Sequence, residues 1–273
     1  MKLIETILLL CFCVNLTYSQ TRLSISKEKD CILAMSAMAY VYKDWQEEYI
    51  APSRGYNIGA ILYDSKNDSI IALDKNSVRQ YGDKTQHAEV RLMQGYMERG
   101  EKAYLDGMQI ITTLEPCMMC SGMMMFLTVD TVKYIQADPE YGKNIERLAM
   151  DWTDEKGSVH PANERAIRIR SVQIELPFLG SILDTAYQKY RKNNPSKGMS
   201  EFLYTENARK IYAFWSDCID MWVVENKENQ RLLNHVRRIL QLGTNVPTDI
   251  KDIHKRNVEK MKFLYKKHEL NKI

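Results

Sequence analysis

The sequence predicts an α/β protein, a three-layer α/β/α sheet followed by a C-terminal helical extension. Short apolar runs typical of buried strands alternate with segments of helical periodicity through the first two thirds of the chain. The sequence Asn-Asn-Pro-Ser-Lys-Gly at 193–198 is typical of a linker, and only helical patterns follow it. A length of 273 residues is enough for one large domain with an appendage.

The first helices and strands are predicted from apolar periodicity and from turn residues. Residues 29–49 carry apolar side chains at helical intervals, and Pro-Ser-Arg-Gly at 52–55 breaks that pattern. The apolar runs 57–63 and 69–73 flank a short polar segment, so they predict a β-hairpin.

The next elements follow the same two signals. A helical run opens at His87, and the apolar strand 108–114 leads to a second helix that continues through 121–127. The last elements expected before the linker are strands over 131–135 and 166–172 and a helix over 179–191.

Residues 196–273 form the expected extension, separate from a domain over 28–195. Its helical segments lie near 200–225, 227–242 and 249–270, with Thr248 as the N-cap of the last. The extension has 15 Lys and Arg against 10 Asp and Glu. A solvated helix face is the leading interpretation of this surplus, and a surface for nucleic acid or an acidic partner is the alternative.

Composition describes an ordinary globular protein, with 45% hydrophobic and 27% charged residues. A net charge of +3 does not by itself indicate nucleic-acid binding. We expect no membrane span in the body of the chain, because no run of about 18 apolar residues occurs there.

Residues 1–19 predict a cleavable export signal, because Lys2 precedes an apolar run that ends in Thr-Tyr-Ser. The mature protein would then be periplasmic or secreted. A buried N-terminal helix in a cytoplasmic protein is the alternative. After export, Cys31 and Cys218 would either form a disulfide or remain buried thiols, and spacing alone does not decide between them.

Two short motifs carry the chemistry, His87-Ala88-Glu89 and Pro116-Cys117-Met118-Met119-Cys120. One imidazole and two thiols can bind Zn²⁺ and leave its fourth tetrahedral position to water. The metal makes hydroxide available near neutral pH, and Glu89 is the expected general acid and base. The sequence therefore predicts a zinc site of His87, Cys117 and Cys120.

Two other interpretations of these motifs remain open. The Cys-x-x-Cys pair alone is also typical of a thiol–disulfide couple. A purely structural zinc site would need a fourth ligand, for which His160 is the candidate in this domain. The combination of both cysteines with His87 and Glu89 favours a catalytic site.

The two motifs have the spacing of the zinc-dependent nucleobase deaminases, and the chain resembles the cytidine deaminase fold. It is most similar to the branch with tRNA adenosine deaminases and guanine deaminases. The likeness covers roughly residues 28–195 and is carried by the segments 74–78, 113–122, 137–139 and 160–163, besides His87-Ala88-Glu89.

The resemblance implies further roles. Asn76 would hydrogen-bond the base, and the backbone N–H of Ala88 or Cys117 would lie near the reacting carbon. Asp138 would either reach the site or cap a turn. A homodimer is also implied.

We therefore predict a zinc-dependent hydrolytic deaminase of a nucleobase or nucleoside, which releases ammonia through a zinc-bound hydroxide with Glu89 as proton shuttle. One alternative is a deaminase of RNA or DNA that uses the basic extension. Another is an inactive family member that acts as a protein-binding module, against which the presence of Glu89 argues.

Overall fold

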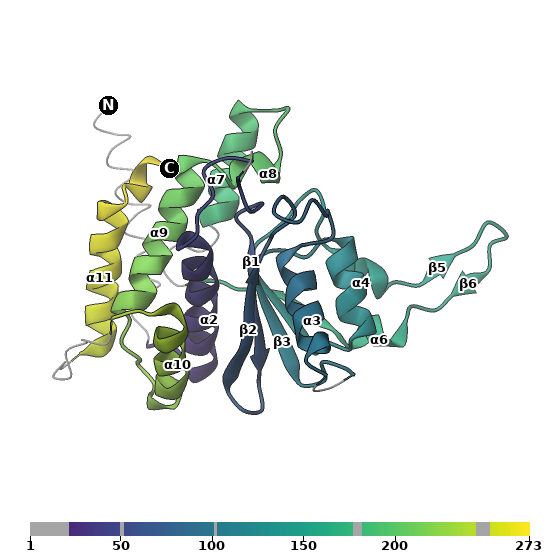
Figure 1. Ribbon diagram of the computed structural model, residues 1–273, viewed down its shortest axis with the longest axis horizontal. Coiled ribbons are helices and arrows are strands. Elements are labelled where there is room, and N and C mark those ends of the chain that lie inside the picture. Colours follow the sequence, from purple (N-terminus) through teal and green to yellow (C-terminus); the bar gives the residue numbers. More distant parts are fainter. Residues whose placement is uncertain (1–21, 50–51, 101–102, 177–181, 244–251) are drawn as a thin grey trace.

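The computed structural model describes residues 22–49, 52–100, 103–176, 182–243 and 252–273 (Figure 1). In chain order its elements are α2 Ile25–Tyr42, β1 Gly59–Asp64, β2 Ser69–Lys75, α3 Ala88–Glu98, β3 Met108–Leu114, α4 Met118–Phe126, β4 Thr131–Gln136, α5 Asn144–Leu148, β5 Trp152–Thr153, β6 Val159–His160, α6 Glu164–Arg168, β7 Arg170–Gln173, α7 Ile182–Asn193, α8 Met199–Phe202, α9 Glu206–Met221, η1 Lys227–Asn229, α10 Gln230–Leu240, α11 Ile253–Lys267 and η2 Leu270–Lys272.

A five-stranded mixed sheet in the order β2-β1-β3-β4-β7 forms the centre of the fold. The expected hairpin pairs β1 with β2 antiparallel, and β1 also pairs antiparallel with β3. Strands β3, β4 and β7 are parallel to one another. The carboxyl ends of β3 and β4 therefore meet at one edge of the sheet.

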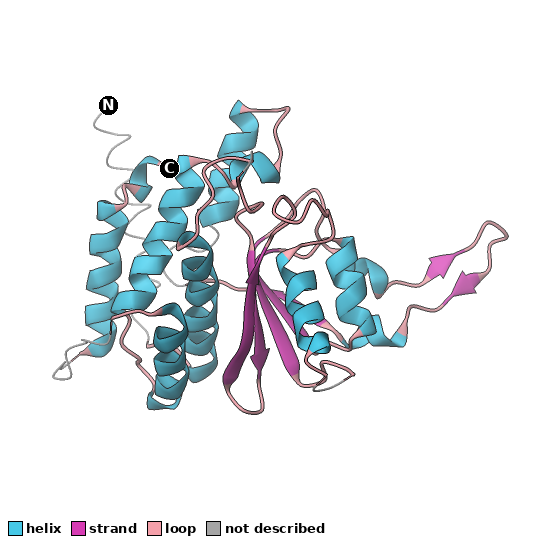
Figure 2. Ribbon diagram, in the orientation of Figure 1, coloured by secondary structure: helices cyan, strands magenta, loops and turns pink. Residues whose placement is uncertain are grey.

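Helices cover both faces of the sheet, which confirms the predicted three layers (Figure 2). Side chains of a strand alternate between the two faces. Ala60 and Leu62 of β1 accordingly belong to the hydrophobic cluster that contains α3 and α4. Ile61 and Tyr63 belong to the opposite cluster, around α2. All six residues of β1 are buried.

Helix α2 is buried on every side, and no position between Cys31 and Ala39 is exposed. A helix that is apolar all round must be covered on more than one side. The sheet covers one side, and α9 of the extension lies along another (Figure 1). The extension therefore shares a hydrophobic core with the sheet, while a domain boundary at 195 stays a prediction.

A buried carboxylate also joins α2 to the extension. Glu28 is fully buried and accepts hydrogen bonds from Trp222 Nε1 at 3.2 Å, Asn226 N at 3.0 Å and Asn229 Nδ2 at 2.8 Å. Such a network offsets the cost of burying a charge and fixes the position of one element against the other.

The predicted strand over 166–172 is partly wrong. Helix α6 occupies its first residues, and β7 begins only at Arg170. The Asn163 side chain accepts a hydrogen bond from Arg165 N and caps this short helix. The expected helix over 29–49 ends at Tyr42, and the segment expected near 200–225 is divided into α8 and α9.

Three predictions from the sequence are not tested by the described residues. The expected export signal and Thr248 lie outside the described residues. The homodimer also remains a prediction. None of the described helices is long and apolar enough to cross a membrane.

Candidate metal centre

His87 and Glu89 lie at the start of α3. His87 is the N-cap residue, with φ −70° and ψ 153°, and its side chain makes no capping hydrogen bond. Arg91, one turn further, donates from Nε to Asp74 Oδ1 at 2.9 Å and so ties the helix start to β2. The imidazole is thus held at the helix N-terminus and is available as a ligand.

Cys117 and Cys120 lie at the start of α4, just beyond the carboxyl end of β3. Cys117 is the N-cap residue, again with extended backbone and no side-chain cap. Cys120 lies three residues further in the first turn, so both sulfur atoms point to the same side of the helix start. The two motifs approach each other because both α3 and α4 pack on the same face of the sheet.

The three donor atoms form a nearly regular triangle. Cys117 Sγ, Cys120 Sγ and His87 Nδ1 lie 3.6 Å from one another in all three pairs. Tetrahedral Zn²⁺ with ordinary bond lengths requires about 3.8 Å between two sulfur ligands and about 3.6 Å between sulfur and nitrogen. The arrangement therefore fits a zinc ion and confirms these three residues as a group that can hold one.

The electrostatics of the two thiols differ. The hydrogen bond between the Cys117 and Cys120 sulfur atoms, and after it the one with His87, lowers the pKa of Cys117 to about 4. The same bond to Cys117, together with burial, raises the pKa of Cys120 well above its usual range. Burial opposes the charged imidazolium of His87, but Cys117 and then Glu89 outweigh it and raise its pKa. Because thiolates are the ligands, metal binding must displace the Cys120 proton.

Glu89 lies beside this triangle and is only 3% exposed. Its Oε1 accepts a hydrogen bond from Thr112 Oγ1 at 3.0 Å, and its Oε2 lies 3.6 Å from Cys120 Sγ. Burial raises the pKa of this carboxyl group. A buried carboxylate with a raised pKa is suited to take up and release a proton.

Asn76, the predicted base-contacting residue, is fully buried next to this region. Its Oδ1 accepts from Tyr56 N at 3.1 Å and Val78 N at 3.4 Å, whereas Nδ2 has no hydrogen-bond partner among the described residues. The neighbouring Ser77 N donates to Gln86 O at 2.9 Å, one residue before His87. A buried amide whose N–H donors have no partner is suited to bind a polar ligand.

Two other predicted residues take different positions. Ala88 is the first residue of α3, where a backbone N–H has no partner within the helix. The Asp138 carboxylate accepts from Glu140 N and Tyr141 N, both at 2.9 Å. Asp138 therefore caps a turn, and its contact with the substrate stays a prediction.

Sequence reasoning missed two residues that hold the site in place. Thr112 lies in β3 and positions the Glu89 carboxylate. Glu115 accepts from Asp138 N at 2.9 Å and from Lys143 N at 2.8 Å, so it joins the loop before Cys117 to the turn after β4. The position of Glu115 directly before Pro116 of the cysteine motif is the one feature of the sequence that could have indicated its role.

His160 does not complete the metal group. It lies on the β5–β6 hairpin, which projects from the body of the molecule (Figure 1). Its ring stacks on Trp152, with centroids 4.2 Å apart, and its Nε2 lies 3.2 Å from Asp154 Oδ2. Cys31 and Cys218 are both buried free thiols, as the second of their two alternatives predicts.

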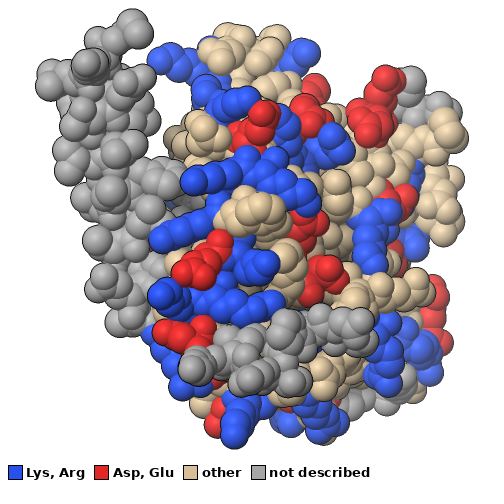
Figure 3. All heavy atoms as spheres, turned by 90° about the vertical axis from the view of Figure 1, so that its left-hand side faces the viewer, with Lys and Arg blue, Asp and Glu red and all other residues tan. Residues whose placement is uncertain are grey.

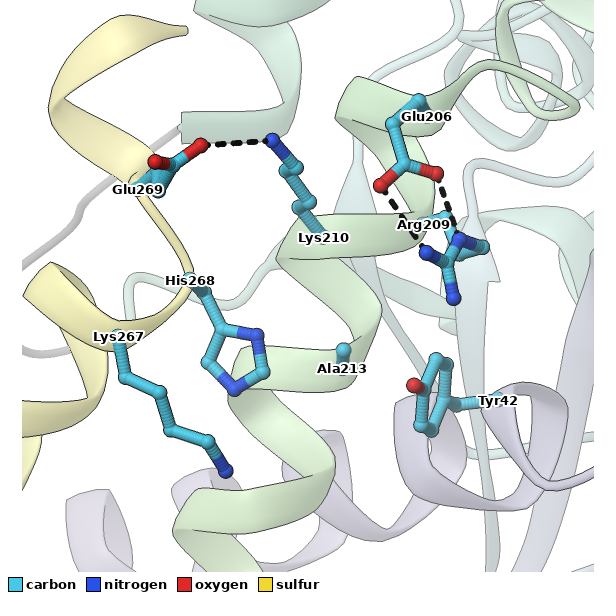
Figure 4. A pocket seen from close by; sticks show the side chains of 8 residues that line it. All are labelled: Tyr42, Glu206, Arg209, Lys210, Ala213, Lys267, His268 and Glu269. Carbon is cyan, nitrogen blue, oxygen red and sulfur yellow. Dashed lines mark hydrogen bonds and ion pairs between the residues drawn. The ribbon is translucent and has the colours of Figure 1, made fainter.

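A separate pocket of about 190 Å³ lies in the extension (Figure 4). It is lined by Tyr42, Glu206, Arg209, Lys210, Ala213, Lys267, His268 and Glu269. Its charges are balanced by ion pairs such as Arg209–Glu206 at 2.6 Å and Lys210–Glu269 at 3.3 Å. It contains none of the residues of the candidate metal centre.

Comparison with known proteins identifies the central part of the chain. Residues 33–136 match the cytidine and deoxycytidylate deaminase zinc-binding region. Over 85 residues the chain is 34% identical to the tRNA-specific adenosine deaminase of Aquifex aeolicus, and the match covers 31% of this chain and 55% of that protein. It is 32% identical over 85 residues to the tRNA(Ile)-lysidine synthase of Deinococcus deserti, across 31% of this chain and 16% of that protein.

A solved guanine deaminase from Nitrosomonas europaea is 18% identical, with a TM-score of 0.37, and the match covers 61% of this chain and 82% of that one. The match of residues 33–136 to this zinc-binding region agrees with the resemblance that the sequence shows. The chain spans about half the length of the curated adenosine deaminase that it matches.

Proposed function

We propose that the chain is a zinc-dependent hydrolytic deaminase that converts an amino group on a nucleobase or nucleoside to a carbonyl and releases ammonia. One observation carries this proposal. A carboxylate that is only 3% exposed lies 3.6 Å from one of three donor atoms that fit zinc. That combination supports hydrolysis at a ring carbon better than a redox or a structural role.

His87, Cys117 and Cys120 would hold Zn²⁺, which supplies water activation at neutral pH. In the overall reaction one water enters, the bond from the ring carbon to the amino nitrogen breaks, and ammonia leaves. Glu89 moves the protons. Thr112 occupies its Oε1, so Oε2 is the atom that carries one proton of the entering water to a ring nitrogen and then carries the second proton to the leaving amine.

Asn76 orients the substrate. Because Oδ1 is already used by two backbone N–H groups, Nδ2 is the atom offered, and it requires an acceptor on the substrate. A site built on such a buried donor rejects rings that lack the matching acceptor. The backbone N–H of Ala88 is a second donor on the same side as the metal ligands.

A screen for ammonia release tests the proposal. The probes are adenine, guanine, cytosine, their nucleosides and an RNA stem-loop, each with the zinc-loaded full chain. Glu89→Gln keeps the shape of the side chain but removes its proton shuttle. We expect it to retain zinc and to release ammonia at least about 100-fold more slowly. A fully active Glu89→Gln protein would disprove the assigned mechanism.

A second candidate, a deaminase of RNA, is favoured by the tRNA-specific relatives and by the basic residues of the extension. Figure 3 shows Lys and Arg side chains gathered on the face of the extension, with Asp and Glu side chains between them. If these contact phosphates, the logarithm of the binding constant for a single-stranded RNA should fall with the logarithm of salt concentration by about 0.7 per contact. Salt-independent binding of the substrate would favour a free base or nucleoside.

A further inference from the structure

A short loop connects Asn76 to the C-terminal extension. It consists of residues 52–58, directly before β1, and is here called the Asn57 loop. On one side Tyr56 N donates to Asn76 Oδ1 at 3.1 Å. On the other side Asn57 Nδ2 donates to the carbonyl of Leu203, between α8 and α9, at 3.0 Å. Two adjacent residues of the loop thus make both contacts: Tyr56 bonds Asn76, which is predicted to bind the substrate, and Asn57 bonds the extension.

Asn57 is fully buried, and its amide is fully used. Besides Leu203, its Nδ2 donates to Gln46 O at 2.8 Å, while its Oδ1 accepts from Gln46 N at 2.9 Å. Gln46 Oε1 in turn accepts from Arg54 N at 2.7 Å. The extension therefore anchors a continuous set of hydrogen bonds that reaches Arg54.

Arg54 passes this anchoring to the segment that carries Asn76. Its guanidinium donates to the carbonyl of Asn76, and its own carbonyl accepts from Arg79 N at 3.1 Å and Gln80 N at 3.0 Å. The Nε of Arg54 is fixed by Asp44 Oδ2 at 2.9 Å. One residue, Arg54, thus holds the backbone that follows the Asn76 side chain.

An aromatic cluster supports the same loop. The rings of Tyr49 and Tyr56 stack with centroids 4.7 Å apart. Tyr204 of the extension packs against both, at 6.2 Å and 6.1 Å. The residue whose N–H bonds Asn76 Oδ1 is therefore backed by a ring from the extension.

The loop has almost no clearance against Asn76. A Cβ atom added at Gly55 would lie 2.5 Å from Asn76 Oδ1, and Gly55 has φ +153°. A small displacement of the loop therefore moves the Asn76 amide with it. Loop position and amide position are coupled.

We propose that the C-terminal extension positions Asn76 for substrate binding, with Leu203 and Tyr204 as the positioning residues and the Asn57 loop as the connection. The inference rests on the proposed function, since it takes Asn76 to contact the substrate. The extension thereby helps to set which substrate binds and how tightly, while zinc and Glu89 are held by other elements.

The test compares Tyr204→Ala and Tyr49→Ala with a matched control, Tyr104→Ala. Tyr49 is 39% exposed with the Arg79 guanidinium 5.0 Å from its ring, and Tyr104 is 45% exposed with Arg165 at 5.7 Å. The first readout is hydrogen exchange of the Tyr56 and Val78 amides, which bond Asn76 Oδ1. We expect exchange about tenfold faster in both test variants, with zinc content and the exchange of β3 amides unchanged.

The second readout is kinetic, with whichever probe of the ammonia screen is turned over. Tyr204→Ala should raise KM about tenfold at nearly unchanged kcat, because a binding contact is weakened and the proton shuttle is intact. Combination with Asn76→Ala should add little further to KM, since both changes act through the same amide.

Unchanged exchange at Tyr56 and Val78 would overturn the proposal, as would equal changes in Tyr104→Ala. A fall in kcat at constant KM would also contradict it. If Tyr204→Ala does not fold, Tyr204→Leu and Tyr49→Ala give the same readouts. Faster exchange without ammonia release from any probe would reject the proposed function but retain the coupling of the extension to Asn76.

Discussion

The four cysteines among the described residues form two chemically different pairs. Cys117 and Cys120 have the imidazole as a neighbour, whereas burial keeps Cys31 and Cys218 protonated by raising the pKa of each. We predict that Cys117→Ala removes zinc from the protein. At free zinc about 100 times the dissociation constant, the lost binding lowers the free energy of unfolding by about 2.7 kcal/mol.

The control for this prediction is Cys218→Ala, which removes a buried sulfur far from the motifs in sequence. It should retain one zinc per chain. Metal analysis and thermal unfolding measure both effects. A Cys117→Ala protein with full zinc content would refute the ligand assignment.

The sequence predicts the principal site residues well because their spacing alone carries the chemistry. His87 and Glu89 lie within one helical turn, as do Cys117 and Cys120, so local geometry brings each pair together. Thr112 could not be predicted, since its contact with Glu89 depends on how α3 lies across β3. The sequence leaves two roles open for Asp138, and the structure adds the contacts by which it caps its turn.

At the scale of elements, Glu115 joins two segments that surround the start of α4. Glu115→Ala leaves the amides of Asp138 and Lys143 without their acceptor. We predict a loss of about 1–3 kcal/mol in the free energy of unfolding, because unsatisfied buried donors carry the full cost of desolvation. Urea unfolding monitored by tryptophan fluorescence measures this change.

The exposed Glu164 provides the comparison, since 88% of its side chain is accessible. Glu164→Ala should alter stability by less than about 0.5 kcal/mol. Equal effects of the two substitutions would show that the contacts of Glu115 do not stabilise the turn.

Periodicity predicts β1, β2, β3, β4 and the helices that follow the two motifs, because each has a clear apolar pattern and turn residues at its ends. It fails at 166–172, where a side-chain cap from Asn163 starts a short helix inside an otherwise strand-like run. The sequence of α2 between Cys31 and Ala39 is almost wholly apolar, which agrees with the burial of every residue in this stretch. That run predicts cover on several sides but not which segment supplies it.

At the scale of the whole molecule, tyrosine and cysteine side chains whose pKa is raised by burial make stability depend on pH in the alkaline range. Burial raises the pKa of Tyr134 and of Tyr212 to about 12 each, and it raises the pKa values of the Cys31 and Cys218 thiols. In the unfolded chain, thiols lose their protons near pH 8.5 and tyrosines near pH 10 (about the values of model peptides).

The unfolded state therefore binds fewer protons than the folded state above about pH 8.5, and stability falls as pH rises. We predict that the urea midpoint is constant from pH 7 to 8 and declines steadily toward pH 11. Replacing Cys31 and Cys218 by Ala should shift the onset of the decline upward to about pH 10, where the tyrosines of the unfolded chain lose their protons. A midpoint independent of pH would contradict the assignment of these groups as buried and neutral.

Helix α2 packs against both the sheet and α9, and this has a practical consequence for anyone who engineers this protein. A shortened gene that stops near residue 195 would leave the apolar surface of α2 facing water, and its product would aggregate instead of forming an isolated folded domain. Fusions and chimaeras should retain the native tail, or else redesign the outer surface of α2 before removing it.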